Sequence, residues 1–171
     1  MGGINFNVLT AAPWETTEIF TVGCNQNCKG CINKFFQDKN SKHRVFDYKE
    51  LAKILFDQIQ DNKLSISGGE PFLQAKGLTF LLKELKSLDK NKEWIILSYS
   101  GYTLENLLKM SIKDSFIIDF LKEINILVDG PYNESLKYTD EEYTFIGSSN
   151  QRVINVPATL RCNFSNIILY N

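Results

Sequence analysis

The sequence has almost no excess charge of either sign. Its 171 residues include 19 Lys plus Arg and 20 Asp plus Glu, which gives a formal net charge of −1 at pH 7. A near-neutral chain in which no run of Lys and Arg stands out lacks the electrostatic footprint of a nucleic-acid-binding protein. We therefore expect no nucleic-acid partner.

Long apolar runs are also absent. No stretch approaches the roughly 20 consecutive apolar residues that a membrane span requires, and residues 1–17 lack the basic-then-apolar order of a signal peptide. We expect a cytoplasmic protein with no membrane partner. Internal repeats, low-complexity tracts and Pro/Gly/Ser linkers are missing too, so residues 1–171 are expected to form a single domain.

Cysteine is scarce, and its distribution is uneven. Three of the four cysteines, Cys24, Cys28 and Cys31, lie within eight residues, and Cys162 lies far from them. This distribution is typical of a metal site in a reducing compartment rather than of a disulfide framework. Thiolates suit zinc or an iron–sulfur cluster. A closed zinc site needs a fourth ligand, and neither Cys162 nor the single histidine, His43, has paired spacing with the other three.

A [4Fe-4S] cluster bound by only three cysteines would leave one iron open to a substrate, so the three-cysteine loop suggests reactivity. Spacing alone still leaves structural zinc and a passive electron carrier as alternatives. Cys162 is expected to be a buried or idle thiol. His43 lies in a polar stretch and is expected to be a surface residue without a role.

Short β-rich segments alternate with amphipathic helical segments along the chain. Buried runs that are each followed by a polar loop and a helix are typical of a parallel sheet. The fold class is therefore α/β with a mostly parallel sheet. Strands are predicted at residues 18–22, 63–67, 94–99 and 124–128, and helices from the cap Asp47 to Ile59, at 78–88, after the cap Thr103 and at 117–121.

Four polar loops follow the predicted strands, at residues 24–31, 68–71, 100–102 and 129–131. In parallel α/β folds the ligands bind at the carboxyl ends of the strands, so we expect these loops to share one rim. The two glycines that begin the second loop admit close approach of the backbone to a ligand. Glu70, next in that loop, supplies a carboxylate that can hold an ammonium group.

Two of these loops carry a resemblance to a known family. The CxxxCxxC segment CNQNCKGC at residues 24–31 and the segment GGEP at 68–71 together resemble the radical S-adenosylmethionine superfamily. The resemblance is closer to one branch, the small activating proteins of anaerobic ribonucleoside-triphosphate reductase. That branch has a Gly just before the third cysteine and an Asn two positions after it, and then three further segments that match SGYT at 100–103, VDGPY at 128–132 and GSSNQR at 147–152.

The sequence departs from the family pattern in two places. Residues 10–16 (TAAPWET) stand where the family usually has Asp/Asn-Gly-Pro-Gly before the first strand. Ile32 stands where an aromatic residue often follows the third cysteine. Both positions are expected near the adenosine site.

The resemblance implies an enzyme that activates a glycyl radical enzyme, specifically anaerobic ribonucleotide reductase. Its cofactors would be a [4Fe-4S] cluster and S-adenosyl-L-methionine, which is cleaved reductively to a 5'-deoxyadenosyl radical that takes hydrogen from a glycine of the partner. A flavodoxin- or ferredoxin-type protein would donate the electron. Because a closed barrel needs about 200 or more residues, the expected fold is an incomplete TIM-like β/α barrel whose open side receives the glycine loop of the partner.

The resemblance also implies a set of site residues. The three clustered cysteines would bind the iron–sulfur cluster as the catalytic and metal ligands. The remaining residues of the expected cofactor site are Gly30, Ile32, Asn33, Ser67, Gly68, Gly69, Glu70, Pro71, Ser98, Ser100 and Asp129.

Two alternative functions remain open. The first is a small radical S-adenosylmethionine enzyme that acts on a free metabolite or a peptide, for which a polar substrate pocket is expected. The second is a non-catalytic zinc or iron–sulfur module that docks to another protein. Metal analysis separates the second from the enzymes, because only the enzymes need about four iron and four sulfide per chain.

Overall fold

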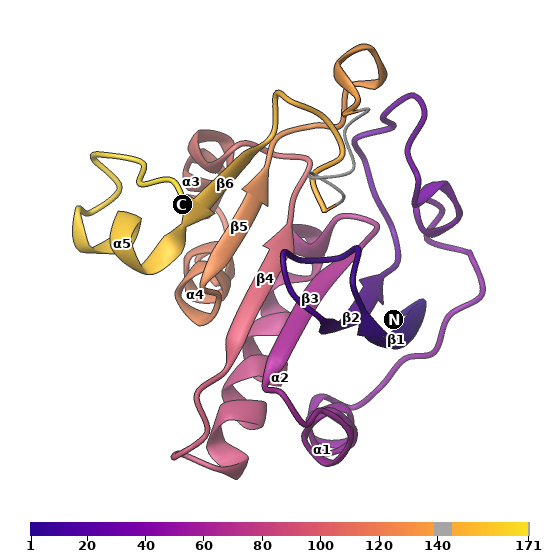
Figure 1. Ribbon diagram of the computed structural model, residues 1–171, viewed down its shortest axis with the longest axis vertical. Coiled ribbons are helices and arrows are strands. Elements are labelled where there is room, and N and C mark those ends of the chain that lie inside the picture. The colour runs from indigo at the N-terminus through magenta and orange to yellow at the C-terminus, as the bar shows by residue number, and fades with distance from the viewer. Residues whose placement is uncertain (139–144, 171) are drawn as a thin grey trace.

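The structure is a computed structural model, and it describes residues 1–138 and 145–170. The described chain forms a mixed α/β fold around a six-stranded sheet (Figure 1). Along the sheet the strands follow one another in sequence order: β1 Gly3–Val8, β2 Thr16–Thr21, β3 Lys63–Gly68, β4 Ile95–Tyr99, β5 Ile126–Asp129 and β6 Arg152–Asn155.

The four central strands, β2 to β5, are parallel, whereas β1 and β6 pair with their neighbours in antiparallel fashion. The predicted α/β class and mostly parallel sheet are therefore confirmed. The sheet is open in the described part of the chain, with β1 and β6 at its two edges. The strands follow sequence order, but the sheet does not close on itself.

The helices begin where the sequence provides caps. The Asp47 carboxylate accepts hydrogen bonds from the backbone N–H groups of Lys49 and Glu50, and the Thr103 hydroxyl accepts one from Asn106, as both predicted caps require. The helices are α1 Tyr48–Gln58, α2 Ala75–Leu88, α3 Leu104–Ser111, α4 Phe116–Glu123 and α5 Val156–Arg161, with short 3₁₀ turns η1 Lys34–Phe36, η2 Pro71–Gln74 and η3 Glu134–Leu136.

The connecting helices of the parallel strands lie on one face of the sheet. Right-handed crossovers between strands in sequential order place their helices on the same side. Figure 1 shows α2 and α4 behind the central strands, and α1 packs against α2. The main hydrophobic core fills the space between, and alternate residues of the strands supply its sheet side. Its fully buried members include Leu55, Leu64, Ile66, Leu82, Leu85, Ile96, Phe120 and Leu121.

The opposite, inner face of the sheet has a much smaller apolar cluster. Leu97, Ile126 and Val128 pack there against Ala12. Residues 9–15, which connect β1 to β2, fold across this face, and the Ser65 hydroxyl donates a hydrogen bond to the Ala11 carbonyl at 2.7 Å. The segment 10–16 that departs from the family pattern therefore covers part of the inner face.

Two edge strands and one helix are additions that the sequence analysis did not predict. β1, β6 and α5 lie at the ends of the chain and are short or partly exposed, so their hydrophobic periodicity is weak. Leu88, the last residue of the predicted helix at 78–88, is 42% exposed because it ends α2. No helix among the described residues is long and apolar enough to cross a membrane.

Candidate functional site

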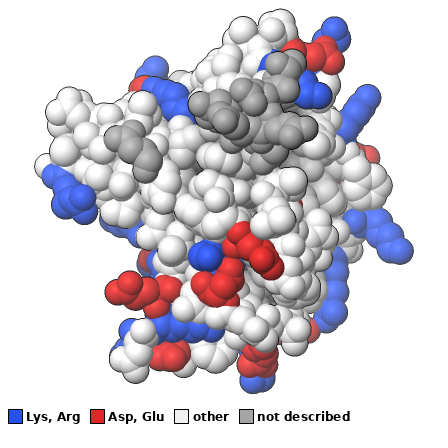
Figure 2. All heavy atoms as spheres, viewed as in Figure 1, with Lys and Arg blue, Asp and Glu red and all other residues white. Residues whose placement is uncertain are grey.

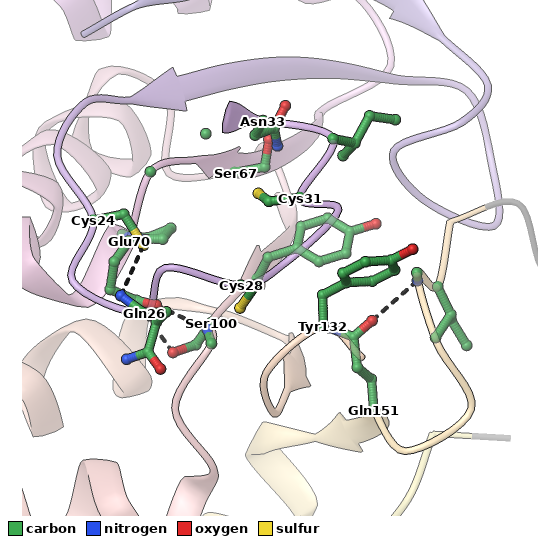
Figure 3. Close-up of a pocket in the computed structure, with 18 of the residues that line it drawn as sticks. Cys24, Gln26, Cys28, Cys31, Asn33, Ser67, Glu70, Ser100, Tyr132 and Gln151 are labelled. Atoms are coloured by element: carbon green, nitrogen blue, oxygen red, sulfur yellow. Dashed lines mark hydrogen bonds between the residues drawn. The ribbon is translucent and has the colours of Figure 1, made fainter. Parts of the chain in front are cut away.

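The three clustered cysteines lie on an irregular loop that follows β2 and lines a cavity of about 840 Å³ (Figure 3). The loop is fixed where it leaves the strand, because Gly23 N–H donates to the Phe36 carbonyl at 2.8 Å and Cys24 N–H donates to the Gln37 carbonyl at 2.9 Å. The chain thus returns on itself around η1. All three thiols are half-buried and unpaired.

The donor set at this loop fits an iron–sulfur cluster. Figure 3 shows the sulfur atoms of Cys24, Cys28 and Cys31 around one shared space. Among the described residues no three Cys, His, Asp or Glu side chains converge as the ligands of a single metal ion would. In a [4Fe-4S] cluster each thiolate binds a different iron, so the sulfurs need not meet at one point. His43 and Cys162 do not line this cavity.

Burial raises the pKa of the Cys24 thiol and that of the Cys28 thiol above the usual value of a cysteine. Both groups are therefore protonated thiols at neutral pH until a metal binds. Thiolate is the form that ligates iron, so assembly of a cluster on this loop must release protons.

The glycine loop after β3 packs directly against the cysteine loop. Gly69 N–H donates to the Thr21 carbonyl at 2.9 Å, and Glu70 N–H donates to the Gly23 carbonyl at 2.8 Å. A Cβ on Gly69 would lie 2.3 Å from the Gly23 oxygen, and one on Gly68, whose φ is +100°, would lie 2.4 Å from the Thr21 oxygen. The two glycines are thus required for contact between two protein backbones, a reason that the sequence analysis did not give.

Glu70 is a buried carboxylate at the junction of three loops. Its Oε1 accepts hydrogen bonds from Phe72 N–H and the Ser100 hydroxyl, both at 3.0 Å, and its Oε2 accepts one from Gly101 N–H at 2.8 Å. Burial raises the pKa of Glu70 to about 7, although these three donors act in the opposite direction. The side chain therefore joins the glycine loop to the β4–α3 loop.

The β4–α3 loop in turn braces the cysteine loop. The Tyr102 hydroxyl exchanges hydrogen bonds with the Asn25 amide at 2.6 and 2.8 Å. A Cβ on Gly101 would lie 2.6 Å from Cγ of Gln26. Glycine at that position lets the two loops approach, so the predicted meeting of strand-end loops at one rim is confirmed for these two.

Most of the predicted site residues do meet at the cavity, and two do not. Ser98 is fully buried, and it alternates with Leu97 and Tyr99 of the inner face, so it faces the helices. Asp129 is also absent from the cavity wall. The predicted residues that line the cavity with the cysteines are Gly30, Ile32, Asn33, Ser67, Gly68, Gly69, Glu70, Pro71 and Ser100.

Asp129 belongs to an ion-pair network that fixes the start of α3. Its Oδ2 accepts a 2.6 Å hydrogen bond from Leu104 N–H, and both of its carboxylate oxygens accept from Arg152. Arg152 also binds both carboxylate oxygens of Glu105, at 2.9 and 2.8 Å. Because Asp129 is 1% exposed, Arg152 neutralises a buried charge, which is a structural contact.

The GSSNQR segment is bonded to the turn after β5. Gln151 accepts from the N–H groups of Gly147 and Ser148 at 3.0 and 3.1 Å and donates to the Gly130 carbonyl at 3.0 Å. Asn150 donates to the Pro131 carbonyl at 2.8 Å. These polar side chains hold two adjacent loops of the cavity rim together.

Several cavity residues were missed by the sequence analysis. Glu18 projects from β2 and accepts a 2.6 Å hydrogen bond from the Ser67 hydroxyl, and burial raises its pKa. The partly buried Tyr99 donates to the Phe145 carbonyl at 2.6 Å. An ionisable residue inside a β-rich run was the available signal for Glu18. Gln26, Tyr132 and Gln151 also line the cavity and were missed.

Comparison with known proteins gives a consistent family. Residues 16–154 match the model of a 4Fe-4S single cluster domain. An anaerobic ribonucleoside-triphosphate reductase-activating protein of Vibrio cholerae is 30% identical over 145 residues, which cover 81% of this chain and 86% of that protein. The protein of the same name from Escherichia coli K12 is 29% identical over 153 residues, covering 82% and 88%.

A second kind of relative matches a shorter stretch. A 7-carboxy-7-deazaguanine synthase of Clostridium acetobutylicum is 34% identical over 98 residues, covering 57% of this chain and 43% of that protein. No solved structure gives a significant match. The family model covers residues 16–154, and the activating protein of Vibrio cholerae is 30% identical over 81% of this chain. The chain therefore belongs to the 4Fe-4S single cluster domain family and, within it, to the anaerobic ribonucleoside-triphosphate reductase-activating proteins.

Proposed function

We propose that this protein is a radical S-adenosylmethionine enzyme that installs a glycyl radical on an anaerobic ribonucleoside-triphosphate reductase. The observation that carries the proposal is the loop of three half-buried thiols at the wall of a cavity of about 840 Å³. When bound, the [4Fe-4S] cluster supplies the electron that cleaves S-adenosylmethionine to methionine and a 5'-deoxyadenosyl radical. The near-full-length match to activating proteins supports the same function.

Cys24, Cys28 and Cys31 would hold the cluster. With only these three protein ligands, one iron would be left open to bind the amino and carboxylate groups of the methionine moiety. The glycine loop and Ser100 border the same space and would orient that moiety. Among the residues that the structure describes, Glu70 Oε2 accepts a single hydrogen bond, so it has capacity left for an ammonium group.

The cavity wall supplies the position and dryness that a radical reaction needs. The inner face of the sheet presents Phe20 and Tyr99 to the cavity, and Tyr132 and Phe145 add further aromatic surface. Such a wall keeps water from the reactive carbon and holds the target close to it. Gly30 and Asn33 border the cysteine loop and would complete the cofactor site.

We further propose that residues 1–171 are one radical S-adenosylmethionine domain and that its open sheet is a partial β/α barrel. The sequential strand order and the helices on one face support this, as in a barrel that stops before closure. The open side would receive the glycine loop of the reductase, and a flavodoxin- or ferredoxin-type protein would supply electrons. Four unpaired cysteines suit the reducing cytoplasm.

The test is anaerobic reconstitution followed by mixing with the reductase. The holoenzyme should contain about four iron and four sulfide per chain and should cleave S-adenosylmethionine. With the reductase it should produce a doublet near the free-electron position in electron paramagnetic resonance. Stoichiometric zinc would contradict the enzyme, and turnover driven by a free metabolite without a glycyl radical would contradict the activase.

Substitution of the cysteines sharpens this test. Replacing any one of Cys24, Cys28 and Cys31 by Ala should abolish the cluster and the cleavage of S-adenosylmethionine, because each thiolate would hold its own iron. Cys162→Ala is the matched control, since Cys162 caps α5 away from the cavity wall. Loss of the cluster in that control would contradict the assignment of three ligands.

A further inference from the structure

The near-zero net charge of the chain conceals a cationic segment beside the cysteine loop. Residues 24–46 contain five cations against the single anion Asp38, whereas the whole chain carries −1. This segment begins with the cysteine loop and continues through η1. The five cations are Lys29, Lys34, Lys39, Lys42 and Arg44.

Three of these cations are available to a partner. Lys34, Lys39 and Lys42 are exposed and make no ion pair among the described residues. Lys29 pairs with Glu134 at 3.1 Å and Arg44 pairs with Glu50 at 2.7 Å, and each of the four side chains is about half exposed or more. Figure 2 shows Lys and Arg side chains along the right-hand edge of the molecule, where Figure 1 places the segment after the cysteine loop.

A second groove, of about 370 Å³, runs along this segment and is separate from the cavity. Val22 and Gly23, the two residues that precede Cys24, form part of its wall, as do Lys39 and His43. Cβ of Lys39 lies 3.7 Å from the position that a Cβ on Gly23 would occupy. The groove therefore reaches the backbone immediately behind the first cluster cysteine.

The groove also carries exposed apolar side chains. Val45 is 83% exposed and Leu73 is 48% exposed, and both line it. Apolar surface beside unpaired lysines is the composition of a docking surface for an acidic protein, because burial supplies affinity and the charges steer the approach. We define the electron-entry surface as Lys39, Lys42, His43, Val45 and Leu73.

We propose that the electron-entry surface docks an acidic one-electron carrier protein. The inference rests on the proposed function, which needs one electron from outside for each S-adenosylmethionine cleaved. The chain has a single cysteine cluster and no second one to relay the electron, so the donor must approach the cysteine loop itself. The carrier loses one electron and the iron–sulfur centre gains it, with no atom transferred.

The two sides of the cysteine loop then have separate tasks. The three thiols face the large cavity, which the reductase glycine must enter, and the groove lies behind Cys24. A donor bound in the groove leaves the cavity mouth accessible. The unpaired lysines favour an acidic carrier as the protein that binds in the groove. The experiment below must distinguish this from binding of the reductase at the same surface.

The experiment compares two reductants on the reconstituted holoenzyme under anaerobic conditions. The rate of cluster reduction is followed by electron paramagnetic resonance or by loss of visible absorbance, with either reduced flavodoxin or photoreduced deazaflavin as the donor. In the Lys39→Glu/Lys42→Glu variant, the flavodoxin rate at low ionic strength should fall by about tenfold or more. The deazaflavin rate should not change, and added salt should slow only the wild-type reaction with flavodoxin.

A matched control carries the same change in charge elsewhere. Lys109→Glu/Lys113→Glu alters α3 and the turn after it, which border neither the cavity nor the groove, and should retain the wild-type flavodoxin rate. Equal flavodoxin rates in the two double variants would overturn the docking proposal. So would a loss of glycyl radical formation by Lys39→Glu/Lys42→Glu under deazaflavin, because it assigns the surface to the reductase.

The two proposals fail in different ways. If the wild-type holoenzyme does not cleave S-adenosylmethionine with deazaflavin, the proposed function is contradicted. If it cleaves with deazaflavin and the surface charges do not affect flavodoxin, only the docking proposal is contradicted.

Discussion

The two faces of the central sheet are built from alternate residues of the same strands, yet they differ in almost every physical property. The helix-covered face supplies Leu64, Ile66 and Ile96 to a continuous apolar core. The inner face presents Glu18, Ser67 and Tyr99 to the cavity, beside a small apolar cluster. One set of positions therefore stabilises the fold, and the other shapes the site.

The difference teaches that a strand of this protein can be changed on one face at a time. A substitution toward the helices should alter the free energy of unfolding without altering the site. A substitution toward the cavity should alter the site, with a smaller effect on the free energy of unfolding than a substitution in the core. The following variants test this separation, from the largest expected effect on stability to the smallest.

Leu82→Ala, in α2 where it packs into the core on the helix-covered side of the sheet, should destabilise the protein most. Leu82 is fully buried in the core, so its truncation loses apolar burial and leaves a cavity, at a cost of about 2–5 kcal/mol. Urea unfolding of the apoprotein under reducing conditions measures the change. Leu88→Ala, at the 42% exposed end of the same helix, should cost less than about 0.5 kcal/mol. Similar losses of unfolding free energy in the two variants would contradict the distinction between the buried core and the exposed surface.

Gly69→Ala tests the contact between the glycine loop and the cysteine loop. The added methyl group would lie 2.3 Å from the Gly23 carbonyl oxygen, so one backbone must move, at about 1–3 kcal/mol. Iron content after reconstitution should fall as well, because the cysteine loop shifts. Gly77→Ala in α2 meets no atom within 4 Å and should stabilise the protein by about 0.5–1 kcal/mol. Normal iron content in folded Gly69→Ala would show that the contact is dispensable.

Ser67→Ala and Ser65→Ala compare two buried hydroxyls of β3. Each variant loses one hydrogen bond, from Ser67 to Glu18 or from Ser65 to the Ala11 carbonyl, so each should cost about 1 kcal/mol. Only Ser67 lines the cavity. An anaerobic titration of S-adenosylmethionine should therefore show weaker binding for Ser67→Ala alone. Equal affinities of both variants would remove Ser67 from the cofactor site.

Glu105→Gln should have the smallest effect, and that effect should depend on pH. Hydrogen bonds from Arg152 lower the pKa of Glu105 to about 2. A carboxyl whose pKa is lowered on folding adds stability above its unfolded value of about 4.5. This stability is lost as the pH falls from about 4.5 to 2. The pair is solvent-exposed on the Glu105 side, so the loss should be about 1 kcal/mol or less.

Urea unfolding of apoprotein at pH 7 and pH 3 checks this prediction. Wild type and Glu105→Gln should differ at pH 7 and converge toward pH 3. Glu93→Gln, an exposed residue without an ion pair among the described residues, is the control and should match wild type at both values. A constant difference between wild type and Glu105→Gln would assign the effect to packing.

Local sequence signals were sufficient for much of the fold and part of the site. Side-chain caps at Asp47 and Thr103 marked two helix starts, and alternating β-rich runs marked β2 to β5. The cysteine spacing and the GGEP segment identified two loops that do meet at the cavity. Edge strands and α5 lacked such signals, because their periodicity is short and their burial is partial.

The sequence by itself determined the chemistry of this protein, because ligand type and loop identity are properties of neighbouring residues. Three thiols in eight residues specify a metal centre whatever surrounds them. Only the tertiary structure decided which face each strand residue occupies and what each loop contacts. In the structure Ser98 and Asp129 do not line the cavity, and Glu18 does. Gly68 and Gly69 lie against the backbone of the cysteine loop and of β2. These outcomes depend on strand pairing between segments about 30 to 50 residues apart, which no local pattern records.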